Sequence, residues 1–147
     1  MSAENTKPAS IPCLCLALRR ASRAVSRLYD EELRGVGLRT TQYSILRLLR
    51  DTGEVRQCDL GEVTVHEETT LTRNLRPLVD AGWIAVRTGE DRREKWLQIT
   101  AAGVAKLEAA RPAWARAQKR MRSRLPEGVW QNLLAVLPEV ALQAADA

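Results

Sequence analysis

The sequence has few of the residues on which metal sites and disulfide frameworks depend. Its 147 residues include one histidine, no phenylalanine and three cysteines. Because His66 is alone and the cysteines are sparse and odd in number, we expect neither a histidine-rich metal site nor a disulfide framework. No glycine-rich phosphate loop, zinc-protease motif or nucleophile elbow is present. We therefore expect no enzyme: no catalytic residues, no cofactor and no metal.

Long hydrophobic segments are also lacking. The apolar runs are only a few residues long, so no segment is expected to span a membrane. The polar residues 1–10 show no signal-peptide pattern, which predicts a flexible tail and favours a cytoplasmic location. Apolar residues nevertheless make up 45% of the chain, enough for a globular core. The net charge of +5 is compatible with a polyanionic partner but does not identify one.

The first strong periodicity predicts a long amphipathic helix. Apolar residues recur at spacings of three and four from Ile11 to Leu28, and this pattern ends near Gly35 and Gly37. Few residues precede this helix. Its apolar side is therefore expected to face another long helix or a partner subunit.

Shorter helices are predicted in the middle of the chain. Thr40 is expected to cap a helix that ends at Gly53. Residues 54–63 form a short helix at most. Residues 67–82 form a longer helix, which is expected to continue through Pro77 because the apolar period persists beyond it.

A change of period then predicts a β-hairpin between helices, which makes the fold mainly α with a small hairpin. Residues 84–87 and 96–99 alternate between apolar and other side chains on either side of the charged loop TGEDRRE. Thr100 is expected to cap the next helix, with a bend at Pro112, and Pro126 to open the last one. The apolar stripe of the first of these helices comprises Val104, Leu107, Trp114, Met121 and Leu125.

The helix at 67–82 and the hairpin together suggest a surface for DNA. The free face of the helix carries short polar and basic side chains: Thr69, Thr72, Arg73 and Arg76. In a major groove, arginine pairs with guanine and threonine contacts base edges or thymine methyls. The hairpin tip carries Arg92 and Arg93, which suit phosphates or the narrow minor groove. Taken singly, these arginines are equally compatible with a solvated surface.

Three segments resemble the winged helix-turn-helix core of MarR-type transcriptional regulators: residues 38–53, 69–84 and 89–103. The most diagnostic piece is Asp91-x-Arg93, followed by Thr100 and Gly103. In that family, the corresponding segment forms the β-hairpin called the wing and the first turn of the helix that follows it. The resemblance extends over residues 11–142 and includes the terminal helices.

The resemblance implies one domain at 11–145, with a DNA-binding lobe at about 38–100 and dimerisation helices at about 11–35 and 100–145. A homodimer would present two recognition helices about 34 Å apart to a pseudopalindromic site in double-stranded DNA. The family implies a repressor released by a small aromatic ligand or by oxidation. The residues that match its DNA-binding positions are Thr69, Thr70, Thr72, Arg73, Asn74, Arg76, Asp91, Arg92 and Arg93.

One departure from the family pattern precedes the recognition helix. Relatives often carry an Asp–Arg pair where this chain has Glu67 and Glu68. Carboxylates suit a helix N-terminus but repel phosphates. An interaction module with weakened DNA binding therefore remains the alternative function.

The first helix resembles that of the organic-hydroperoxide-sensing branch. The reactive cysteine of that branch aligns with Cys15, and its partner tyrosine with Tyr29. On one helix these residues lie about 21 Å apart, so they would meet only across a dimer. Arg19, one turn away, would favour the thiolate where the branch has a tyrosine. Cys13 is expected about 200° around the helix from Cys15, so a disulfide between them would require unwinding.

Other roles for these residues stay open. Cys15 is equally compatible with a structural place in the dimer interface, and a Cys15-dependent peroxidase lacks a histidine base or a resolving pair. Arg19, Arg23, Tyr29 and Trp114 are candidates for an effector cleft that binds a carboxylate or phenolate. Cys58 is expected to pack as a small hydrophobe, and His66 to be a partly buried spacer.

Overall fold

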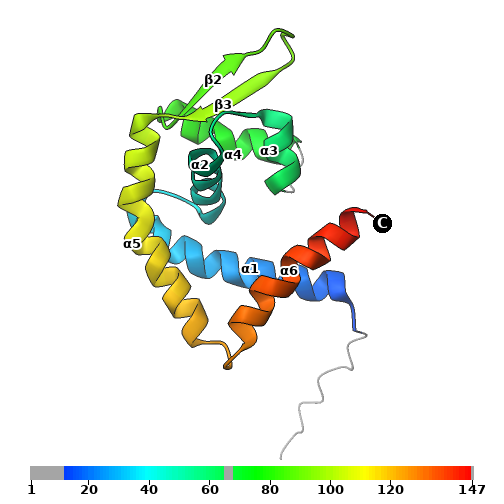
Figure 1. Cartoon of the computed structure of the whole chain (residues 1–147). Coiled ribbons are helices and arrows are strands. Elements are labelled where there is room, and N and C mark those ends of the chain that lie inside the picture. Colours follow the sequence, from blue (N-terminus) through cyan, green and yellow to red (C-terminus); the bar gives the residue numbers. More distant parts are fainter. Residues whose placement is uncertain (1–11, 65–67, 147) are drawn as a thin grey trace, which may run out of the picture.

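The computed structural model describes residues 12–64 and 68–146. The elements in chain order are α1 (Leu14–Leu33), the 3-10 helix η1 (Arg34–Val36), α2 (Thr40–Thr52), β1 (Val55–Arg56), α3 (Gln57–Thr64), α4 (Glu68–Asp80), β2 (Ile84–Thr88), β3 (Lys95–Ile99), α5 (Ala101–Ser123) and α6 (Val129–Ala145) (Figure 1). The predicted tail at 1–10 lies outside these residues. No helix in the described ranges combines the length and hydropathy needed to cross a membrane.

The predicted mainly helical fold with a β-hairpin is confirmed, but the sheet is larger than predicted. Within the described residues it has three antiparallel strands in the order β1-β3-β2. The additional strand pairs Val55 with Leu97 and Arg56 with Trp96. The sequence suggested only a short helix there, because a two-residue strand is too short to show a period. Pairing with a distant strand, not local sequence, creates β1.

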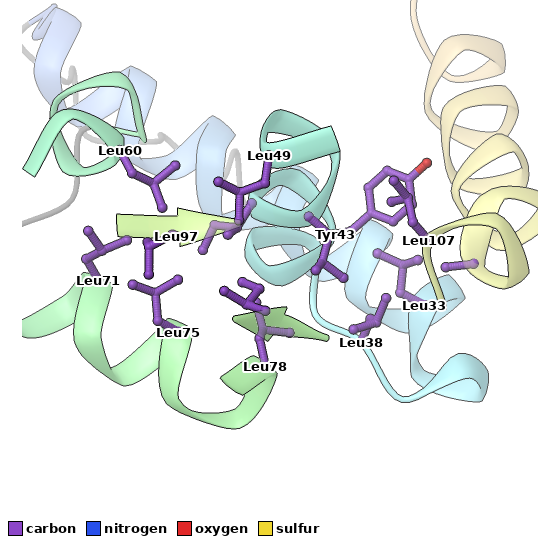
Figure 2. Close-up of a cluster of buried hydrophobic side chains, with 14 of the residues drawn as sticks. Leu33, Leu38, Tyr43, Leu49, Leu60, Leu71, Leu75, Leu78, Leu97 and Leu107 are labelled. Atoms are coloured by element: carbon purple, nitrogen blue, oxygen red, sulfur yellow. The ribbon is translucent and has the colours of Figure 1, made fainter. Parts of the chain in front are cut away.

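Leucines from several elements converge in the core that holds the hairpin against the helices. Leu49 of α2, Leu60 of α3, Leu78 of α4 and Leu97 of β3 are fully buried together (Figure 2). Leu107 of α5 joins the same cluster. The packing therefore fixes α4 and the hairpin relative to α2 and α5.

The two long helices α1 and α5 are joined by ion pairs as well as by packing. Arg120 of α5 lies 2.9 Å from Glu31 and 3.5 Å from Glu32, and Arg116 lies 3.3 Å from Glu32. The carboxylates that pair with these two arginines lie far away in the sequence and are brought to α5 by α1.

The buried face of α5 differs from the predicted apolar stripe. Its buried residues are Gly103, Leu107, Ala110, Ala113 and Ala117. Val104 is 36% exposed, and α5 is continuous through Pro112. Most of these buried residues are glycine or alanine. A prediction based on large apolar side chains does not detect a face made of such small residues.

Two predicted helix starts are also corrected. The last helix does not begin at Pro126: Pro126 accepts a turn bond from Val129, and Gly128, at φ 79°, precedes the first helical residue. Thr40 is not a cap but the first residue of α2. Its backbone N–H donates to the Asp30 carboxylate at 2.7 Å, so a side chain of α1, and not the threonine hydroxyl, caps the start of α2.

Thr100 is confirmed as the cap of α5, and its removal is expected to be costly. Its hydroxyl accepts from the N–H of Gly103 at 3.0 Å and donates to the carbonyl of Gly82 at 2.6 Å. We expect Thr100→Val to lower the free energy of unfolding by about 1–2 kcal/mol. Thr100→Ser, which keeps the hydroxyl, is the control in urea unfolding. Equal stability of the two variants would contradict this role.

Candidate DNA-binding interface

Helix α4 presents a polar face opposite its buried one. Leu71, Leu75 and Leu78 are buried at spacings of three and four, which turns Arg73 and Arg76 outwards. The predicted helix continues through Pro77. The face left free by the core therefore carries cations that extend into solvent.

The other candidates on α4 have more varied surroundings. Thr70 is exposed, and Thr72 lies 3.5 Å from the side-chain amide of Gln57. Asn74 is half-buried, and its amide oxygen accepts from the Thr41 hydroxyl at 3.4 Å. His66 and Glu67 lie outside the described residues, as do the side chains of Glu68 and Thr69.

The wing tip is a turn organised by Asp91. Its carboxylate accepts from the backbone N–H of Arg93 at 3.0 Å, and its carbonyl accepts from Glu94 at 2.9 Å. Arg92 and Arg93 are exposed. Asp91 thus shapes the backbone from which the two arginines project.

Ion pairs hold the base of the wing. Arg87 of β2 pairs with Glu54 and lies over the Trp96 ring, 5.0 Å from its centroid. Arg56 contacts Asp59 at 2.9 Å and Glu94 at 3.9 Å. Sequence reasoning missed this arrangement, because it depends on the strand register that places Arg87 opposite Trp96.

The Glu54–Arg87 pair predicts a measurable titration shift. The hydrogen bond from Arg87 lowers the pKa of Glu54 below its ordinary value of 4.5. Because the folded pKa is the lower one, the stabilisation is present at neutral pH and is lost as the pH falls through the folded pKa. In Arg87→Gln, we expect the pKa of Glu54 to return towards its ordinary value in an NMR titration. An unchanged titration would contradict the pair.

A cavity of about 480 Å³ lies between α3, α4 and the wing. Its lining includes Arg56, Cys58, Arg93 and Lys95. Cys58 is exposed, so the expectation that it packs as a small hydrophobe is wrong. Across the described residues, no cluster of metal-ligating side chains is found.

The candidate redox residues lie at the start of α1. Cys13 precedes the helix in an extended conformation, and Cys15 lies in its first turn; both are exposed. The expected placement of Cys13 around the same helix is therefore wrong. Tyr29, near the other end of α1, donates to Gln118 of α5, and burial raises its pKa.

Trp114 packs against residues of α2. Its ring stacks on Tyr43 at 5.8 Å between centroids, and the Arg47 guanidinium lies 4.9 Å above it. Arg19 and Arg23 are exposed on α1. The described residues that line the cavity beside Trp114 belong to α2 and α5.

The comparisons with known proteins agree with this architecture. Residues 38–95 match the model of the MarR family. The M. tuberculosis transcriptional regulator MosR, solved in complex with DNA, is 33% identical; the match covers 92% of this chain and 97% of that one, with a TM-score of 0.79. The HTH-type transcriptional regulator YwoH of Bacillus subtilis is 32% identical over 91 residues, which are 62% of this chain and 66% of that protein. MarR from E. coli shares the fold, with a TM-score of 0.72 at 22% identity.

Helix α4 packed beside a three-stranded antiparallel sheet is the arrangement of a winged helix-turn-helix protein. The structural match to MosR, which covers 92% of this chain, and the family model at residues 38–95 identify the family within this class. The chain belongs to the MarR family of transcriptional regulators. Its relatives are regulators, which agrees with the expectation that it is not an enzyme.

Proposed function

We propose that the protein is a homodimeric, sequence-specific DNA-binding repressor. The observation that carries this proposal is the exposed polar face of α4 beside an exposed basic wing tip. Arg73 suits base edges in the major groove, whereas Arg92 and Arg93 suit phosphates or the minor groove. The similar MosR has been solved in complex with DNA, which supports a DNA-binding role for this chain. Such a regulator acts where the DNA is, in the cytoplasm.

The second subunit is proposed because apolar surface remains uncovered on the terminal helices. Leu14 and Leu16 of α1 are 66% and 54% exposed, and Leu134 of α6 is 61% exposed. No residue of α6 is buried. Exposed apolar patches of this kind mark interaction surfaces. We assign residues 11–35 and 100–145 to dimerisation and residues 38–100 to DNA binding, within one domain at 11–145.

Release from DNA is proposed to follow from a small aromatic ligand or from oxidation of Cys15. In the oxidative route, the Cys15 thiolate attacks the terminal oxygen of an organic hydroperoxide: an S–O bond forms as the O–O bond breaks, which gives a sulfenic acid, and the leaving alkoxide takes a proton from water to become the alcohol. The exposure of Cys15 supports access by the oxidant.

Fluorescence anisotropy on DNA from just upstream of the gene tests this function. We expect tight binding by the reduced protein and much weaker binding by Arg73→Gln. One equivalent of organic hydroperoxide should release the wild type but not Cys15→Ser. Survival of binding in both oxidised proteins would exclude the thiol route and leave the aromatic ligand. Failure of the reduced protein to bind DNA would favour an interaction module.

A further inference from the structure

A small cavity between α2 and α5 has the chemistry of an anion site. Its volume is about 190 Å³, and its charged lining comprises Arg47, Arg50, Glu108 and Arg111. The described residues that line it belong to α2 and α5 and include none of those proposed to contact DNA.

Cations outnumber carboxylates in this cavity. Glu108 is shared between Arg50 at 3.4 Å and Arg111 at 3.7 Å, and Arg50 also contacts Asp51 at 3.0 Å. Arg47 lies over the Trp114 ring and forms no ion pair within the described part of the chain. Three guanidinium groups thus face one carboxylate in the lining, which leaves positive charge for a ligand to neutralise.

The buried hydroxyl of Tyr43 provides a second, independent observation. Tyr43 is only 5% exposed, and its ring is fixed between the core and Trp114. Figure 2 shows its oxygen at the edge of the leucine cluster, on the side nearest α5. Among the described residues this hydroxyl has no hydrogen-bond partner, although the cavity includes Tyr43. Buried hydroxyls ordinarily have one.

The ionisation state of Tyr43 suits donation to an anion. Burial raises the pKa of Tyr43 above its ordinary value, although Arg47, Arg50 and Arg111 act to lower it. The hydroxyl therefore keeps its proton at neutral pH. A phenolic O–H together with guanidinium N–H groups forms a set of donors, which calls for a ligand rich in acceptor oxygens.

We propose that this cavity binds a compact oxyanion, with Tyr43, Arg47 and Arg111 as donors. The chemical class is a phosphate or sulfate group, because most of the lining is charged and the volume is small. This inference does not depend on the proposed DNA-binding function.

Isothermal titration calorimetry of the full-length protein with inorganic phosphate, without DNA, tests the site. We expect saturable binding of one phosphate per chain, shared by sulfate and much weaker for benzoate. Tyr43→Phe keeps the ring stack, and Arg47→Gln changes an exposed side chain. Each is expected to weaken binding about tenfold by removing one charge-assisted hydrogen bond.

The control is Arg122→Gln, a charge change at an exposed position farther along α5, which should leave phosphate affinity unchanged. Three results would overturn the proposal: no saturable binding of phosphate, equal affinity in all variants, or binding of benzoate in preference to phosphate. Because the assay contains no DNA, none of these results bears on DNA binding.

Discussion

Substitution of Gly103 by alanine is expected to lower the free energy of unfolding by about 3 kcal/mol, near the upper end for overpacking a buried site. A β-carbon at this position would lie 2.2 Å from the carbonyl oxygen of Trp83 and 2.7 Å from Cγ1 of Ile99. The carbonyl is backbone, and it also accepts the N–H of Thr100 at 3.0 Å. It therefore cannot move without disturbing the start of α5.

Gly35→Ala is the matched control. No atom lies within 4 Å of a β-carbon built there, so its effect on stability should be small. Urea unfolding followed by circular dichroism measures both variants. If the two alanine variants were equally stable, the close approach of α5 to Trp83 would be contradicted.

The double variant Leu133→Glu/Leu137→Glu is expected to convert the protein to monomers. Both side chains are 41% exposed and lie one helical turn apart on α6. Charges there would have to be buried in a dimer, at a cost that the apolar contact cannot offset. Loss of the second lobe should weaken DNA affinity about 100-fold or more.

The matched control places the same two charges on the other side of α6. Gln131→Glu/Ala135→Glu has the same spacing, and both positions are exposed. Analytical ultracentrifugation should show this control to be dimeric and the leucine variant monomeric. A dimeric leucine variant would place the dimer interface elsewhere.

Local sequence signals predicted the elements that hold the proposed DNA surface. The leucine period of α4 survives Pro77, and Thr100 caps α5, because both depend on neighbours within a few residues. Features set by distant partners were not predictable in this way. Strand β1 forms because it pairs with β3. Helix α2 begins at Thr40, whose backbone N–H is bonded by the distant Asp30.

The same distinction applies to the candidate sites. The wing arginines follow from the hairpin pattern, whereas the Glu54–Arg87 pair required the register of β2 and β3. The stack of Trp114 on Tyr43 likewise depends on the packing of α5 against α2, which no local pattern shows. A periodicity shows which face a residue occupies but not which element covers it.

The salt dependence of DNA affinity is the most direct test of the central claim that α4 and the wing bind DNA. In anisotropy titrations at several salt concentrations, log K should fall linearly with log salt. Arg92→Gln/Arg93→Gln should reduce the magnitude of the slope by about 0.9 for each phosphate that the variant no longer neutralises. No DNA binding at low salt, or a slope unchanged by the double variant, would contradict the account.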